Sequence, residues 1–210
     1  MQGACVFISG HTGKTRHSVF ALILGLATAA GLAASVESAS AQFIQQFEKN
    51  TQPFLSIDEV RVGGLKQAVD DAPGEGGPAL NLEVLFGRVP SSHYENHILD
   101  FFLTPRPYIG ANIAFGKTDQ FYWGAAWDFK IMDRLYFEAD FGGAAHDGPL
   151  SELQRASYGC TVNFKEAANL GYALSEHWRV LAEVDHMSNA GLCGTNRGLT
   201  NAGVRLGYKW

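Results

Sequence analysis

Apolar and polar side chains alternate along most of the chain, in stretches of about ten residues that are separated by Gly, Pro, Asn and Asp. In residues 120–130, for example, Phe121, Trp123 and Phe129 fall on alternate positions. This period of two is typical of a β-strand with two unlike faces. Strands are predicted near residues 57–65, 79–87, 108–116, 120–130, 134–142, 158–172, 178–187 and 202–210. No segment shows sustained helical periodicity, so the chain is predicted to be all-β.

The two faces of these strands differ in a way that favours a membrane barrel. The apolar faces carry large aromatic residues near the strand ends, namely Phe121, Trp123, Trp127, Phe129, Trp178, Tyr208 and Trp210. The opposite faces carry charges of both signs, namely Glu83, Asp128, Lys130, Glu138, Asp140, Arg179, Glu183, Arg205 and Lys209. Aromatic girdles face lipid in outer-membrane barrels, and mixed charges can pair in a narrow lumen. We therefore predict an eight-stranded antiparallel transmembrane β-barrel of the outer membrane. Closure of the barrel leaves no unpaired strand edge in contact with lipid.

The N-terminus has the pattern of a secretory signal peptide. Basic residues precede an almost uncharged run, residues 19–36, and Ala39 and Ala41 follow with the spacing of a cleavage site. We expect residues 1–41 to be the signal peptide and residues 42–210 to be the barrel domain. Because the apolar run is near the length of a membrane-spanning helix, an uncleaved anchor is the alternative.

Charge and histidine spacing limit the ligands that the chain is expected to bind. A formal net charge of −5 gives no basic signature for nucleic acid. His93, His97 and His146 are dispersed, with few carboxylates placed to join them as metal ligands. The sequence therefore predicts no metal and no other cofactor.

The lengths of the connections predict which end of the barrel faces outward. Outer-membrane barrels have short periplasmic turns and long external loops. The tight turns at 132–133 and 175–176 are then periplasmic, and the loops at 66–78, 117–119, 144–157 and 188–201 are external. The connection from Arg88 to Pro105 is long for a periplasmic turn. With its apolar residues 101–103, it would lie against the membrane interface or the barrel mouth, and the sequence does not decide between them.

Two cysteines, Cys160 and Cys193, lie in the exported part of the chain. An oxidising compartment favours a disulfide between them, and two separate thiols are the alternative. Both fall at the external ends of neighbouring predicted strands. A bridge there would pin the last external loop beside His186.

His186 and Ser188 are the candidate catalytic pair. Strand parity places both on the apolar face, and alternate residues of a strand lie about 6 to 7 Å apart. A serine hydroxyl becomes a nucleophile when an adjacent imidazole takes its proton. The Gly/Asn-rich residues 189–198 offer amides of the kind that form an oxyanion hole. A histidine on a lipid-facing stripe is costly, which favours function. The alternative is that the strand has already left the hydrocarbon, so that His186 is an ordinary headgroup-level residue.

The motif His-Met-Ser-Asn-Ala at residues 186–190, followed by Asn-Arg-Gly at residues 196–198, resembles the lipid A 3-O-deacylase (PagL-type) family. Weaker similarities run through residues 104–110, 146–148 and 203–210. The resemblance implies an eight-stranded outer-membrane barrel that removes the ester-linked acyl chain at position 3 of lipid A. It assigns Ser188 as nucleophile and His186 as base, with the site on the outer wall near the outer leaflet. It also assigns Asn196 to the oxyanion hole, with Asn189 and the backbone near Gly191 as neighbours.

The third member of the triad is missing from its expected place. Well-known members of the family have a glutamate two residues after the glycine of Asn-x-Gly, whereas this chain has Thr200. Thr200 or Asn201 would orient His186 by a neutral hydrogen bond. Asp185 would do so if the strand bulges, although parity points it into the lumen. A weaker orienting residue implies slower turnover, or a site retained without activity.

The leading hypothesis is therefore an outer-membrane carboxylic ester hydrolase that acts on lipid A in a Gram-negative bacterium. Its expected partners are lipid A or lipopolysaccharide and the outer membrane, and a homodimer is left open. A non-enzymatic barrel with an adhesive or structural role is the main alternative. A soluble exported barrel that binds a small apolar ligand is the third.

Overall fold

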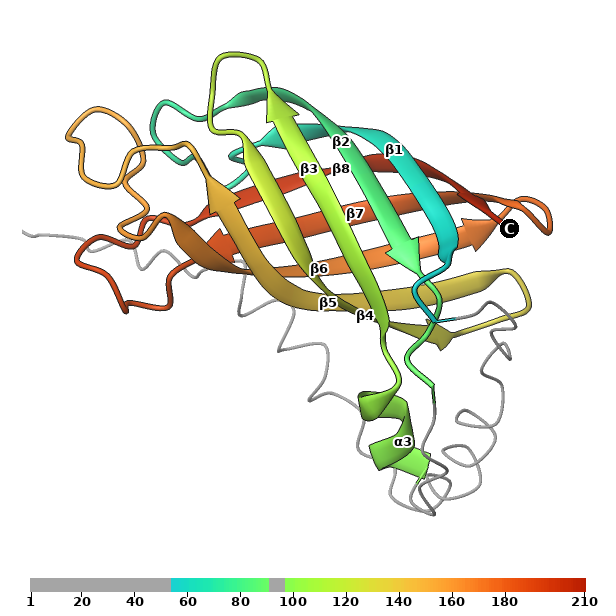
Figure 1. The fold of residues 1–210 in the computed structure, drawn as a ribbon. Coiled ribbons are helices and arrows are strands. Elements are labelled where there is room, and N and C mark those ends of the chain that lie inside the picture. The colour runs from blue at the N-terminus through green and yellow to red at the C-terminus, as the bar shows by residue number, and fades with distance from the viewer. Residues whose placement is uncertain (1–53, 91–96) are drawn as a thin grey trace, which may run out of the picture. The chain divides into compact units, whose positions relative to one another are not determined.

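Eight antiparallel strands form a closed barrel in the computed structural model, which describes residues 54–90 and 97–210 (Figure 1). The expected signal peptide, residues 1–41, lies outside the described residues. The strands are β1 (Ile57–Gln67), β2 (Gly77–Phe86), β3 (Arg106–Ala114), β4 (Gln120–Lys130), β5 (Leu135–His146), β6 (Val162–Ala173), β7 (Trp178–Ser188) and β8 (Leu199–Lys209). Each strand pairs with its neighbours in the chain, and β1 pairs with β8 to close the sheet. The predicted fold class is confirmed.

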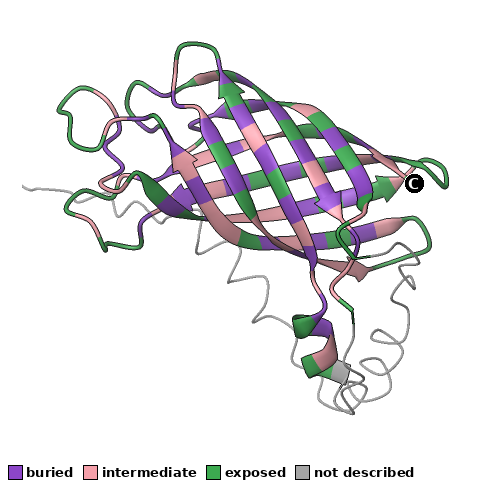
Figure 2. Cartoon of the chain, viewed as in Figure 1, coloured by how far each residue is buried: buried purple, intermediate pink, exposed green. Residues whose placement is uncertain are grey.

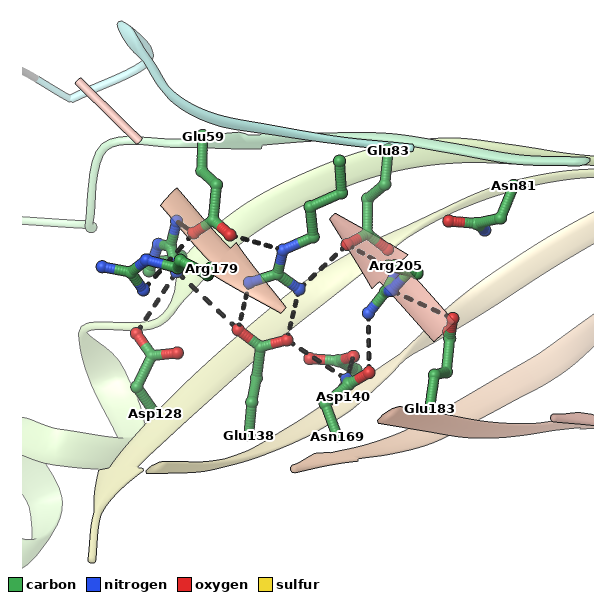
Figure 3. A network of polar contacts seen from close by, with 12 residues as sticks. Glu59, Asn81, Glu83, Asp128, Glu138, Asp140, Asn169, Arg179, Glu183 and Arg205 are labelled. Carbon is green, nitrogen blue, oxygen red and sulfur yellow. Dashed lines mark hydrogen bonds and ion pairs between the residues drawn. The ribbon is translucent and has the colours of Figure 1, made fainter. Parts of the chain in front are cut away.

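The faces of the barrel are arranged as the charge pattern predicts. Buried and exposed residues alternate along each strand (Figure 2), and the large exposed residues of the strands are mainly apolar. Most charged residues of the strands point into the lumen, where they pair (Figure 3), whereas Lys66 and Glu166 lie on the outer face. Arg61 contacts Glu59, Glu83 and Glu138 at 2.7, 3.1 and 2.5 Å. Since an unpaired charge in a dry interior costs several kcal/mol, such a lumen needs this density of ion pairs.

The connection between β2 and β3 holds a short helix that the sequence did not predict. This helix is α3 (His97–Leu103). Phe101 packs its ring 4.9 Å from that of Phe129, and the indole nitrogen of Trp127 donates a hydrogen bond to the carbonyl of Phe102 at 3.2 Å. Seven residues are too few to show helical periodicity in the sequence, so packing against β4 decides the helix. No helix of the described ranges is long and apolar enough to cross a membrane.

Some strands differ in length from the prediction, and one difference matters for the site. The strand β8 begins at Leu199, three residues before its predicted start, because residues 199–201 pair with residues 185–187 of β7. Thr200 is therefore a strand residue rather than a loop residue. Four long connections, residues 68–76, 115–119, 147–161 and 189–198, gather at one end of the barrel (Figure 1), which we call the loop end.

Candidate active site on the outer wall

His186 and Ser188 lie on the outer face of β7, near the loop end. Both are half-buried, whereas Asp185 and Met187 next to them are buried on the lumen side. The pair therefore has the orientation that strand parity predicts. The adjacent strands β6 and β8 provide its neighbours on the barrel wall.

Two rows of outward residues cross the barrel wall at this point. In the first row, His186 lies directly between Glu166 of β6 and Thr200 of β8. The second row runs from Ser188 to Phe164 of β6, and then to residues 143 of β5 and 123 of β4. Directly opposed residues of antiparallel strands have Cβ atoms about 5 Å apart. Each row is thus a line of neighbouring side chains.

The imidazole of His186 is held on two sides by β8 and the loop before it. Its Nδ1 atom is hydrogen-bonded to Thr200 Oγ1 at 2.8 Å. On the other side lies Gly198, where an added Cβ would be 2.7 Å from Cε1 and 3.0 Å from Nε2 of the ring. Gly198 has a φ of 70°, which also favours glycine. The absence of a side chain at Gly198 is what leaves room for the imidazole.

The two other orienting residues that the sequence suggests lie on the opposite side of the barrel wall. Asn201 is fully buried in the lumen and donates a hydrogen bond to Asp185 at 3.0 Å. Asp185 also forms an ion pair with Lys165. Because β7 and β8 do not bulge here, parity keeps both side chains away from the outer face. Among the three alternatives, the structure brings Thr200 onto the imidazole.

Asn189 is the centre of the loop that follows β7. Its side chain donates hydrogen bonds to the carbonyls of Tyr158 at 2.7 Å and Thr195 at 2.5 Å, and accepts one from the Gly191 amide at 2.8 Å. The backbone amide of Asn189 donates to Asn196 Oδ1 at 2.9 Å. The amides of Asn189 and Gly191, two of the suggested oxyanion donors, are therefore engaged within the loop in this structure.

Asn196 keeps a donor for a ligand. Its side chain is exposed, and its Oδ1 atom accepts the hydrogen bond from Asn189. This bond orients the carboxamide, and within the part of the chain that the structure describes its Nδ2 group donates to no other residue. An exposed carboxamide held by its oxygen is suited to donate to a developing negative charge.

A disulfide ties this loop to the connection before β6. The structure joins Cys160 and Cys193, whose Cα atoms lie 5.6 Å apart. Beside it, Gly159 approaches the loop so closely that a Cβ would lie 2.1 Å from the carbonyl oxygen of Thr195. The backbone carbonyl of Tyr158 accepts the hydrogen bond from Asn189. Burial raises the pKa of the Tyr158 side chain, so its phenol stays neutral. These contacts fix the position of the loop next to Ser188.

A cavity of about 310 Å³ lies at the loop end of β5 and β6, beside the candidate pair. Gly143 is one of the residues that line it, and it has no side chain between its cross-strand neighbours Trp123 and Phe164. The cavity is lined by Gly142, Gly143, Cys160, Val162, Asn163, Phe164, Asn189 and Leu192. Phe164 is the cross-strand partner of Ser188, so the largely apolar cavity adjoins the serine.

The sequence pointed to the pair but not to the residues that surround it. Gly198 belongs to the Asn-x-Gly motif, and its contact with His186 was not predicted. Gly143 interrupts the aromatic outer face of β5, and this interruption is visible in the sequence, but the sequence alone does not show that a cavity lies there. Within residues 54–90 and 97–210, no cluster of three or more His, Cys, Asp or Glu side chains is suited to hold a metal ion. His93 lies outside the described residues.

The fold and the outward pair define an outer-membrane β-barrel with a candidate site on its lipid-facing wall. Residues 120–209, which contain β4 to β8, match the model of the family described as lipid A 3-O-deacylase (PagL). This match includes every residue of the candidate pair and its loop. The match agrees, over this part of the chain, with the PagL-type resemblance that the motif indicated. A location in the Gram-negative outer membrane follows from the closed barrel with its apolar outer face.

Solved structures with the same fold include the crystal structure of the outer membrane enzyme PagL. It shares 18% sequence identity with this chain, with 71% of this chain and 97% of that chain covered and a TM-score of 0.53. The N-terminal β-barrel domain of Pseudomonas aeruginosa OprF is 12% identical, with 73% and 98% covered and a TM-score of 0.48. Neisserial surface protein A is 10% identical, with 72% and 95% covered and a TM-score of 0.43. No curated protein sequence matches the chain.

Proposed function

We propose that this protein is a lipid A 3-O-deacylase that uses Ser188 as nucleophile and His186 as general base. The main support for this proposal is the arrangement of the two side chains. A histidine oriented by a 2.8 Å hydrogen bond at Nδ1 lies two residues from a serine, and both face outward from the barrel. Because Nδ1 is bonded to Thr200, we assign Nε2 as the ring nitrogen that takes a proton from the serine hydroxyl.

The chemistry follows from this arrangement. Ser188 Oγ attacks the carbonyl carbon of the ester at position 3 of lipid A, and its proton passes to His186. The Nδ2 group of Asn196 donates to the oxygen that becomes negative. The imidazolium then gives its proton to the departing sugar oxygen, which leaves an acyl-serine. Water, deprotonated by the same imidazole, releases the 3-hydroxy fatty acid and restores Ser188.

The position of the pair supports a substrate that stays in the membrane. Lipid-facing residues surround it, and the neighbouring cavity offers an apolar surface of the size that a fatty acyl chain occupies. With the loop end facing outward, the site lies near the outer leaflet, where lipid A resides. A soluble ester would have to enter this wall from water, which makes it a poorer substrate.

The direct test is the conversion of lipid A by the purified full-length protein in detergent micelles. Mass spectrometry should show loss of one 3-hydroxyacyl group, and fragmentation should place the lost ester at position 3. Release of the acyl chain attached elsewhere on lipid A would change the assigned specificity. Lipid A that stays intact with folded protein would refute the proposed function.

Filling the cavity is expected to weaken the use of long acyl chains. A valine at Gly143 would project between Trp123 and Phe164, with its Cβ atom 3.2 Å from the Trp123 ring. If the cavity holds the acyl chain, kcat/KM should fall by about ten-fold or more, since a single methylene group in an apolar pocket changes it by roughly 10- to 200-fold. The measurement is the rate of fatty acid release from lipid A species of different chain length.

The matched control for this variant is Gly64→Val. Gly64 also faces outward, on β1, and a Cβ there would meet nothing within 4 Å. The control should keep the wild-type rate. Equal rates for Gly143→Val and wild type on the longest chains would show that the acyl chain lies elsewhere.

A further inference from the structure

Asp70 of the β1–β2 connection lies against the start of β8. Its Oδ1 atom accepts a hydrogen bond from the Thr200 amide at 3.4 Å, and its Oδ2 atom lies 3.3 Å from Arg197 Nη1. The carbonyl of Asp70 accepts a second bond from Arg197 at 2.9 Å. The preceding amide, of Val69, donates to the Thr200 carbonyl at 2.9 Å. Asp70 therefore contacts the residues on both sides of Gly198.

Barrel closure and a tight turn bring Asp70 to this place. The seam between β1 and β8 runs up to the pair Lys66 and Ala202, and the Val69 to Thr200 bond continues it. Ala68 and Asp71, which flank the segment, have φ values of 54° and 57°. Each such non-glycine residue costs about 1 kcal/mol, so surrounding contacts must hold this backbone in place. The result of the turn is that the Asp70 carboxylate faces β8.

The segment that Asp70 holds is the one that touches the imidazole. Thr200 is bonded to Asp70 through its amide and to His186 Nδ1 through its hydroxyl. Arg197, on the other side of Gly198, is bonded to Asp70 by its two terminal guanidinium nitrogens, Nη1 and Nη2. Movement of Asp70 would therefore release Thr200 and Gly198 together from His186.

The charges near His186 leave a role for the Asp70 carboxylate. Asp185 and Lys165 form an ion pair on the lumen side, Glu166 is the cross-strand neighbour on β6, and Arg197 is the partner of Asp70. Ester cleavage by a serine and a histidine passes through an imidazolium, which a nearby negative charge stabilises. Thr200 is neutral and contributes orientation without charge. Asp70 is the carboxylate that is bonded to the orienting residue itself.

We propose that Asp70 is the positioning residue of this site, which fixes Thr200 and Gly198 against His186 and supplies the negative charge that Thr200 lacks. This inference rests on the proposed deacylase function. The positioning carboxylate would thus come from the connection between β1 and β2, 130 residues before Thr200.

The test compares Asp70→Asn with wild type in the lipid A assay. Asparagine keeps the size of the side chain and an oxygen for the Thr200 amide, so the barrel should fold as before. Loss of the charge should lower kcat by about ten-fold, the factor that corresponds to one pKa unit of interaction, with KM unchanged. Asp71→Asn, which removes the neighbouring exposed carboxylate, is the control and should match wild type.

A rescue variant separates positioning of the imidazole from general loop stability. Thr200→Glu places a carboxylate where the threonine hydroxyl meets Nδ1, so adding it to Asp70→Asn should restore most of kcat. The inference is overturned if Asp70→Asn has the wild-type kcat, or if its loss of rate is not recovered by Thr200→Glu. Wild-type protein that releases no fatty acid would overturn the proposed function, and this inference with it. Active wild type with an inactive Ser188→Ala and a fully active Asp70→Asn would overturn this inference alone.

Discussion

Replacing Ser188 by alanine is expected to reduce release of the 3-hydroxy fatty acid by about 10⁴-fold or more, because it removes the hydroxyl that forms the acyl intermediate. Ser188 is half-buried on the outer wall, so the lost hydroxyl leaves no cavity in a packed core. The melting temperature of the barrel should therefore stay within a few degrees of wild type. The measurement is the acyl content of lipid A by mass spectrometry over time.

The control for this variant is Ser151→Ala, at an exposed serine in the connection between β5 and β6. It should have the wild-type rate. A fluorophosphonate, which reacts with activated serines, should label the wild-type protein at Ser188 and should fail to label the alanine variant. If Ser188→Ala releases fatty acid as fast as wild type, Ser188 is not the nucleophile, even if lipid A is the substrate.

Replacing Gly198 by alanine is expected to lower kcat by about 100-fold, the effect that a displacement of about 1 Å can have on a catalytic group. The new methyl group would lie 2.7 Å from Cε1 and 3.0 Å from Nε2 of His186, so the ring must move. Since Gly198 does not belong to the apolar cavity, KM should change little. Steady-state kinetics on lipid A would separate the two parameters.

Alanine at Gly198 also strains the backbone, and Gly191→Ala controls for that strain. Gly191 has a φ of 81°, close to the 70° of Gly198, but a Cβ there would meet nothing within 4 Å. The Gly191 variant should therefore have the same backbone strain without displacing the imidazole. Equal losses of kcat in both variants would show that loop strain, rather than the position of His186, limits the reaction.

The strands and their faces could be predicted because alternation is a local property of the chain. Charges of both signs on one face and aromatic residues on the other were enough to place Arg205 in the lumen and Trp178 outside. The same parity placed His186 and Ser188 together on the outer wall. None of these inferences required knowledge of which strands pair.

The loop after β7 was predicted less well, because it has no regular structure and the sequence does not indicate which of its residues form hydrogen bonds with one another. Asn189 and Gly191 were expected to offer free amides, yet both amides are used inside the loop. Asn201 was an alternative partner of His186, yet the early start of β8 fixes its parity toward the lumen. The helix α3 escaped prediction because it is short and depends on contacts with β4.

The sequence by itself determined the barrel, its two faces and the pair His186 and Ser188, because each depends on side chains that alternate within one strand. Only the tertiary structure decided what surrounds the pair. Gly198 meets the imidazole because β8 pairs with β7, and Asp70 meets Thr200 because β1 closes the barrel on β8. Asp70 and Thr200 are 130 positions apart in the sequence, and they come into contact only when the whole sheet closes. A local sequence pattern cannot predict such a distant contact.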